Sequence, residues 1–154
     1  MSTPDLFANF SSFQLTTHNE YKLHEALGFI YAVCYQPTPD DLVPFYGGQT
    51  TRLWGRVDDY ARPDFNAATD FKVGIAVRHL LACGFAVVVK YKAVANRNAE
   101  EETMLRSLRE QGFTLLNDLR GYDYRTADQA EEQRRIKEAI DIILQLAVVN
   151  EATP

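Results

Sequence analysis

The chain has 154 residues, enough for one domain with a sizeable core, and its 46% hydrophobic and 12% aromatic content excludes a disordered protein. The formal net charge of −5 argues against a protein that binds nucleic acid through its overall charge. Residues 46–97 nevertheless carry eight Lys and Arg against four Asp, a net +4 that leaves −9 on the rest. Charge alone therefore allows a locally basic, phosphate-binding face or an ordinary mixed surface.

The cysteines and the hydrophobic pattern indicate a compartment. Cys34 and Cys83 lie in apolar surroundings without metal-ligand spacing, which predicts reduced, packed thiols. The first thirteen residues lack the basic start and the apolar run of a signal peptide, and no apolar stretch approaches the length of a membrane span. We therefore expect a soluble, cytoplasmic protein with no membrane partner.

The first third of the chain predicts a hairpin. Residues 1–15 resemble a loose leader, and a short helix that begins at Thr16 or Thr17 is expected to end at Gly28. Residues 29–35 and 45–49 are rich in the β-branched and aromatic types that favour strands. A proline-rich loop separates the two segments. We expect them to form an antiparallel hairpin with a longish connection.

Two helices and a third strand are predicted next. A helix is expected from residue 52 to about residue 60, because Pro63 breaks it. A second helix, from residue 69 or 70 through residue 82, ends just before Gly84. The Val-rich segment 85–91 is the clearest strand of the chain.

The last part of the chain predicts two further helices. Asn98 is expected to cap a helix over residues 99–111, which Gly112 closes. A final helix runs from about residue 127 to residue 148 and carries one apolar stripe. That stripe consists of Ile136, Ile140, Ile143, Leu144 and Ala147.

These elements predict a small α/β layer domain with a three-stranded antiparallel sheet flanked by helices and an extra C-terminal helix. We divide the chain into an N-terminal leader and helix (1–27), a main domain (28–120) and a C-terminal helical extension packed on that domain (121–154). The exposed side of the last helix would be available to a homodimer, although covering its own domain is the simpler account.

Two short tyrosine-bearing segments carry the main functional signal. They read Gly28-Phe29-Ile30-Tyr31 and Phe45-Tyr46-Gly47-Gly48-Gln49-Thr50. Arg56 follows Gly48 by eight residues, and it shares one helical stripe with Arg52 and Tyr60. Phenols can move protons and a guanidinium can bind a phosphate through two hydrogen bonds, so this arrangement suits attack on a phosphodiester. A solvated arginine face is the plainer interpretation.

Glu101 is the carboxylate that we single out. The apolar positions that follow it are Met104, Leu105 and Leu108. Their spacing places Glu101 on the buried side of its helix, where a carboxylate needs an arginine or a metal ion as partner. Glu100 and Glu102 are interpreted as surface residues that the helix dipole favours. Asn117, after this helix, is commonly only a turn residue.

The order of these segments resembles the GIY-YIG nuclease family over residues 28–117. Phe29-Ile30-Tyr31 matches the first motif, with phenylalanine in place of its glycine, and Tyr46-Gly47-Gly48 matches the second, with glycine in place of an aliphatic residue. The remaining matches are Arg56, Tyr60, Glu101 and Asn117. Gln49 stands where some relatives carry lysine.

The resemblance implies an endonuclease that hydrolyses DNA with one divalent ion, Mg²⁺ or Mn²⁺, held by Glu101. Tyr46 or Tyr31 would activate the attacking water, and Arg56 would favour phenolate and stabilise charge on the phosphoryl group. Tyr60 would position substrate or water. The predicted substrate contacts are Arg52, Gln49 and Asn117.

Two other classes of function remain open. One is a non-catalytic member of the family that binds nucleic acid or protein, which the acidic charge and the altered motif glycines motivate. The other is an unrelated α/β binding module in which Tyr31 and Tyr46 only pack in a core.

Overall fold

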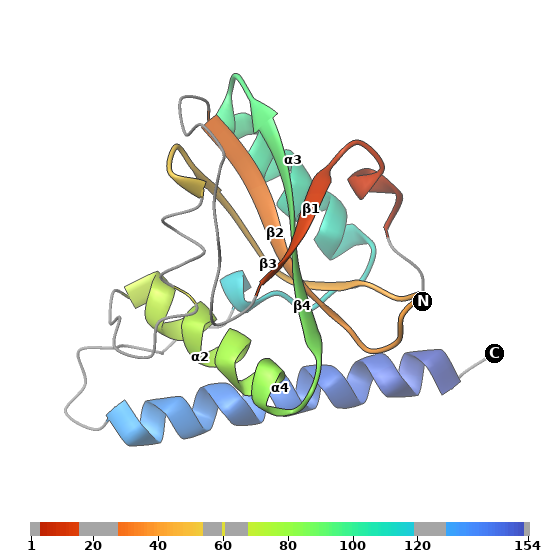
Figure 1. Cartoon of the computed structure of the whole chain (residues 1–154), viewed down its shortest axis with the longest axis vertical. Coiled ribbons are helices and arrows are strands. Elements are labelled where there is room, and N and C mark those ends of the chain that lie inside the picture. Colours follow the sequence, from red (N-terminus) through yellow and green to blue (C-terminus); the bar gives the residue numbers. More distant parts are fainter. Residues whose placement is uncertain (1–3, 16–27, 54–59, 61–67, 119–128, 153–154) are drawn as a thin grey trace.

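The computed structural model describes residues 4–15, 28–53, 60, 68–118 and 129–152 (Figure 1). The helix expected after residue 16 therefore lies outside the described residues. Of the helix expected from residue 52 to residue 60, three residues are described: Leu53 and Tyr60 have helical backbone, whereas Arg52 does not.

A four-stranded antiparallel sheet forms the centre of the protein. Its strands are β1 (Ser11–Leu15), β2 (Gly28–Gln36), β3 (Val43–Thr50) and β4 (Ala86–Val94), in the order β1-β4-β2-β3. The predicted hairpin of β2 and β3 is confirmed. The prediction of three strands is wrong, because β1 adds a fourth from the segment that we expected to be a loose leader.

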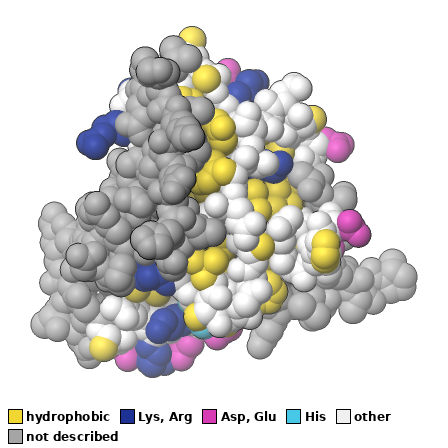
Figure 2. All heavy atoms as spheres, viewed as in Figure 1, with side chains coloured by type: hydrophobic (Ala, Val, Ile, Leu, Met, Phe, Trp, Pro, Cys, Tyr) yellow, Lys and Arg dark blue, Asp and Glu magenta, His cyan; other side chains and the backbone are white. Residues whose placement is uncertain are grey.

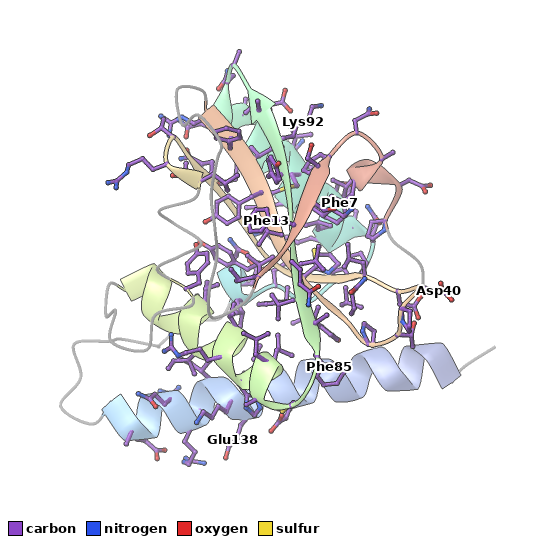
Figure 3. All side chains as sticks on the ribbon, in the orientation of Figure 1. Phe7, Phe13, Asp40, Phe85, Lys92 and Glu138 are labelled. Atoms are coloured by element: carbon purple, nitrogen blue, oxygen red, sulfur yellow. The ribbon has the colours of Figure 1, made fainter. Side chains whose placement is uncertain are left out.

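β1 forms through tertiary pairing. Only Phe13 and Leu15 of its five residues are apolar, so the local pattern is weak. Phe13, labelled in Figure 3, pairs with Val89 of β4. Its ring centroid lies 5.7 Å from that of Tyr91. Leu15 is fully buried. The added strand thus covers one edge of β4 and contributes to the core.

The described helices lie on both faces of this sheet (Figure 1). Helix α3 (Arg97–Glu110) covers one face, while α2 (Ala68–Ala82) and α4 (Gln129–Ala152) cover the other. Two 3₁₀ turns, η1 (Asp5–Phe7) and η2 (Leu116–Asp118), complete the described elements.

Most of the predicted helix ends are confirmed. Gly84 and Gly112 follow α2 and α3 with φ of 88° and 91°, a backbone conformation in which glycine has no Cβ penalty. The predicted cap of α3 is wrong. Asn96 rather than Asn98 caps it, since its side chain accepts a hydrogen bond from the Ala99 N–H at 3.3 Å.

Alternation along β2 separates two cores. One face of the strand presents Phe29, Tyr31, Val33 and Tyr35 to the side of α2 and α4, where Ile136 and Ile140 of the predicted stripe are also buried. The other face presents Ile30, Ala32 and Cys34 to α3. Because β2 is central and covered on both faces, it is apolar almost throughout. The two motif tyrosines belong to the α2 and α4 side.

The two cysteines have different environments. Both are free thiols, but only Cys34 is packed, with its side chain fully buried, whereas Cys83 is exposed at the end of α2. The prediction of two packed thiols is therefore wrong for Cys83, because the chain leaves the helix there through Gly84. Among the described residues, no helix combines the length and apolar character needed to cross a membrane.

Candidate functional site

Three of the predicted tyrosines meet on one face of the sheet. The ring centroids of Tyr31 and Tyr46 are 6.3 Å apart, those of Tyr31 and Tyr60 are 6.4 Å apart, and those of Tyr46 and Tyr60 are 6.2 Å apart. Each of these separations is typical of interacting aromatic pairs. We call these three residues the tyrosine cluster.

A short hydrogen bond joins two of the phenols. The hydroxyl oxygens of Tyr31 and Tyr60 are 2.6 Å apart, and either can be the donor. These side chains are nearly inaccessible, with 2% of Tyr31 and 0% of Tyr60 exposed, compared with 8% of Tyr46. Tyr46 is thus the member of the cluster closest to solvent.

The second motif glycine makes room for the first motif tyrosine. Gly48 of β3 lies opposite Tyr31 in the sheet register. A Cβ on Gly48 would lie 2.5 Å from the Tyr31 hydroxyl oxygen and 2.6 Å from its Cζ. The Tyr31 ring therefore extends over the backbone of β3. In this position its hydroxyl reaches the hydroxyl of Tyr60.

Tyr60 is also held through its backbone. Arg78 Nη1 of α2 donates a hydrogen bond to the Tyr60 carbonyl oxygen at 3.2 Å. Gly74 permits this approach, since a Cβ there would lie 3.2 Å from the same carbonyl oxygen. The sequence analysis missed Arg78, whose only signal was its place one helical turn after Gly74.

Asn117 binds the backbone of the second motif strand. Its Nδ2 donates to the Gly47 carbonyl oxygen at 2.7 Å, and its Oδ1 accepts from the Gly47 N–H at 3.0 Å. The amide thus forms both hydrogen bonds that a neighbouring strand would form. Asn117, predicted as a substrate contact, here holds the edge strand β3.

Gln49 joins the second motif strand to the start of α3. Its Oε1 accepts from Arg97 Nη1 at 2.7 Å, and its Nε2 donates to Asn98 Oδ1 at 3.0 Å. A Cβ on Gly28 would lie 2.5 Å from Arg97 Cγ, so that glycine makes room for the arginine stem. The sequence analysis missed Arg97, because nothing local linked it to Gln49.

The structure describes one of the two arginines predicted on the first helix. Arg52 is exposed, and its backbone N–H donates to Thr50 Oγ1 at 2.9 Å. Its side chain is therefore accessible to a ligand. Arg56 lies outside the described residues.

Glu101 lies on α3 and is half-buried. The predicted apolar side of this helix is confirmed, because Met104, Leu105 and Leu108 are all buried against the α3 face of the sheet. Burial raises the pKa of the Glu101 carboxyl above its usual range. Glu101 thus belongs to the helix on the opposite face of the sheet from the tyrosine cluster.

The part of the chain that the structure describes holds no large group of metal ligands. Within the described ranges, no three or more His, Cys, Asp or Glu side chains form a group that could hold a metal ion. The site predicted from the sequence contains a single carboxylate, that of Glu101, and not three or more such side chains. The Glu101 carboxylate is an oxygen donor, the type of ligand that a hard cation such as Mg²⁺ prefers, and burial partly desolvates it.

Comparison of the chain with protein-family models, with curated proteins and with solved structures found no match. The function of the chain is therefore inferred from its residues and from the geometry described above.

Proposed function

We propose that this chain is a metal-dependent endonuclease of the GIY-YIG type, which hydrolyses phosphodiester bonds in DNA. The observation that supports this most directly is the hydrogen bond between Tyr31 and Tyr60, with the Tyr46 ring beside both. Three phenols selected from their sequence positions form one cluster, and proton transfer requires such convergence.

The proposed roles follow from exposure and contact. Tyr46, the most exposed of the three, takes the proton of the attacking water in its phenolate form, which the Arg56 cation favours. Tyr31 and Tyr60 share a short hydrogen bond, and a phenol that donates such a bond stabilises negative charge on its neighbour. Tyr31 and Tyr60 thus form a hydrogen-bonded pair beside the Tyr46 ring.

The charged groups complete the proposal. Arg56 stabilises the charge that develops on the phosphoryl group, and the exposed Arg52 binds a flanking phosphate. Glu101 would hold Mg²⁺ or Mn²⁺, which supplies Lewis-acid stabilisation of the leaving oxyanion when bound. Gln49 and Asn117 hold the second motif strand in position through their contacts with α3 and with Gly47.

Plasmid cleavage tests this function. We expect the wild-type chain to nick supercoiled DNA in the presence of Mg²⁺, and Glu101→Gln and Arg56→Ala to abolish nicking. Tyr46→Phe should lower the rate by about 10²–10⁴-fold, the usual contribution of a general base. Glu102→Gln is the matched control, because Glu102 is an exposed neighbour of Glu101 that pairs with Arg106. Equal activity in Glu101→Gln and Glu102→Gln would contradict the proposal.

A second candidate is a non-catalytic module on the same scaffold. The burial of Tyr31 and Tyr60 favours it, and so does the place of Glu101 on a helix that covers the other face of the sheet. In that case the chain binds DNA without cleaving it, and Arg52→Ala weakens binding while Glu101→Gln leaves it unchanged. If neither binding nor cleavage is found, the tyrosines only pack in the core.

A further inference from the structure

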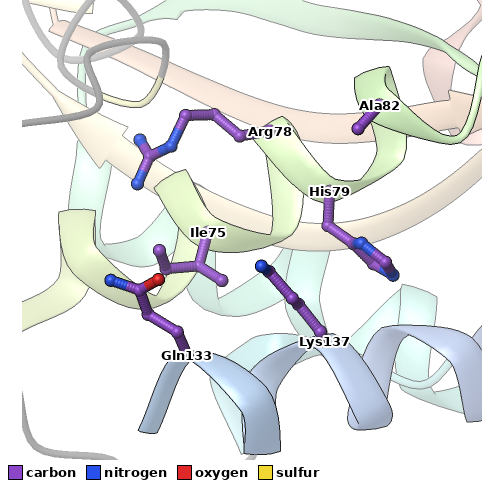
Figure 4. Close-up of a pocket in the computed structure, with 6 residues that line it drawn as sticks. All are labelled: Ile75, Arg78, His79, Ala82, Gln133 and Lys137. Atoms are coloured by element: carbon purple, nitrogen blue, oxygen red, sulfur yellow. The ribbon is translucent and has the colours of Figure 1, made fainter. Parts of the chain in front are cut away.

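A groove of about 250 Å³ opens between α2 and α4 (Figure 4). Its described lining residues are Ile75, Arg78, His79, Ala82, Gln133 and Lys137. Ile75 and Ala82 supply an apolar part, and the other four side chains are polar or cationic. An apolar surface with a few convergent polar groups is typical of small-molecule sites.

The lining is positively charged. Arg78 and Lys137 are cationic, and none of the six described lining residues is a carboxylate. The carboxylate of Asp141 on α4 accepts a hydrogen bond from His79 Nε2 at 2.9 Å. Figure 2 shows Lys and Arg side chains at this end of the molecule, with Asp and Glu side chains beside them. Among the described residues, Arg78 and Lys137 thus line the groove, and the carboxylate of Asp141 contacts it through His79.

Lys137 differs from the cation one turn before it. Arg134 is exposed and forms ion pairs with Glu131 and Glu138, so helical neighbours neutralise its charge. Lys137 forms no ion pair with another described residue. Figure 4 shows its side chain extending from α4 towards α2, between Ile75 and His79. Its ammonium group therefore faces the groove, and it forms no ion pair with a described carboxylate.

The other polar groups have defined positions. Asp141 orients the His79 ring through Nε2, and the bond to the Tyr60 carbonyl oxygen orients the Arg78 guanidinium. Gln133 adds an amide from α4 across from Ile75 (Figure 4). A ligand would meet fixed groups on α2 and one adaptable ammonium on α4, which lowers the entropic cost of binding.

We propose that this groove binds the phosphate group of a small phosphomonoester. A phosphate group matches the positive charge of the Lys137 ammonium, and its oxygens accept hydrogen bonds from ammonium and amide donors. The volume is slightly below the usual range of about 300–1,000 Å³ for ligand pockets, so it suits a compact ligand. This site is separate from the tyrosine cluster, and the inference does not depend on nuclease activity.

Titration with inorganic phosphate, followed through the backbone amide signals of the ¹⁵N-labelled chain, tests the proposal. Ionic strength is held constant by replacing NaCl. We expect saturable shifts at the six lining residues, and a dissociation constant about fivefold higher in Lys137→Gln, the effect of one partly exposed charge.

Arg134→Gln is the matched control, because it removes one cation from the same helix outside the groove. It should leave the dissociation constant within about twofold of the wild type. The proposal is wrong if phosphate gives no saturable shifts at the lining residues. It is also wrong if Lys137→Gln and Arg134→Gln bind phosphate equally well, since the effect would then be one of overall charge.

Discussion

Gly47 and Gly48 are adjacent glycines on opposite faces of β3, and alanine at the two positions should have different effects. The Cβ of Gly48→Ala would lie 2.5 Å from the Tyr31 hydroxyl oxygen and 2.9 Å from its Cε1, so it meets a rigid, buried ring. Forcing such a ring aside costs about 1–3 kcal/mol. Displacement also breaks the 2.6 Å bond to Tyr60, a further loss of about 1 kcal/mol. The free energy of unfolding should therefore fall by about 2–4 kcal/mol.

Gly47→Ala is the control. Its Cβ would meet Leu105 Cδ2 at 2.7 Å and Met104 Cε at 2.9 Å, which are the far ends of flexible side chains. These can move, so we expect a loss of about 1 kcal/mol or less. Urea unfolding followed by circular dichroism measures both variants. With a slope of about 2 kcal/mol/M, Gly48→Ala should lower the midpoint by about 1–2 M.

Removing the clashing oxygen supplies a second check. In the Gly48→Ala background, Tyr31→Phe should cost less than it does in the wild type, because it removes the atom nearest to the new Cβ. Equal destabilisation by Gly47→Ala and Gly48→Ala, or strict additivity of Gly48→Ala with Tyr31→Phe, would refute the packing argument.

Two other predictions concern titration and thiol reactivity. Burial raises the pKa of Glu101 in the folded state. The protonated carboxyl therefore contributes stability that is fully present below the pKa of the unfolded chain, about 4.3. That stability is lost as the pH rises through the folded-state pKa. In metal-free buffer, Glu101→Gln should therefore gain stability relative to the wild type as pH rises through this window, and parallel pH profiles of the two would show that Glu101 is not desolvated. Burial also raises the pKa of the Cys34 thiol, so a thiol reagent should modify Cys83 quickly and Cys34 only on unfolding; Cys83→Ser should abolish the fast phase, and a fast phase that survives would contradict the burial of Cys34.

The sequence predicted those helices and strands whose local composition suits the positions that they occupy in the fold. The Val-rich run of β4 and the glycine-terminated helices α2 and α3 were found close to their observed ends. β4 extends to Val94, beyond the predicted end, because Gly28 of β2 pairs with Val94. β1 was not predicted, because its Ser and Gln residues do not favour a strand by themselves. They form one by pairing with the edge of β4.

The tyrosines of the candidate site could be selected from the sequence, but their geometry could not. Motif spacing identified Tyr31, Tyr46 and Tyr60. The contact between two of their hydroxyls depends on the missing side chain of Gly48 and on the carbonyl contact of Arg78, which join residues far apart in the chain. Gln49 and Asn117 were selected for substrate binding, whereas their recorded contacts hold β3 to α3 and to η2.

The pairing of Asn117 with Gly47 has a consequence for how this protein meets other chains. β3 is an outer strand of the sheet, and outer strands present unpaired N–H and C=O groups that another polypeptide can extend. At Gly47 one side-chain amide already occupies both groups. A foreign strand cannot add to the sheet there without displacing η2, so the asparagine protects this edge against β-sheet aggregation.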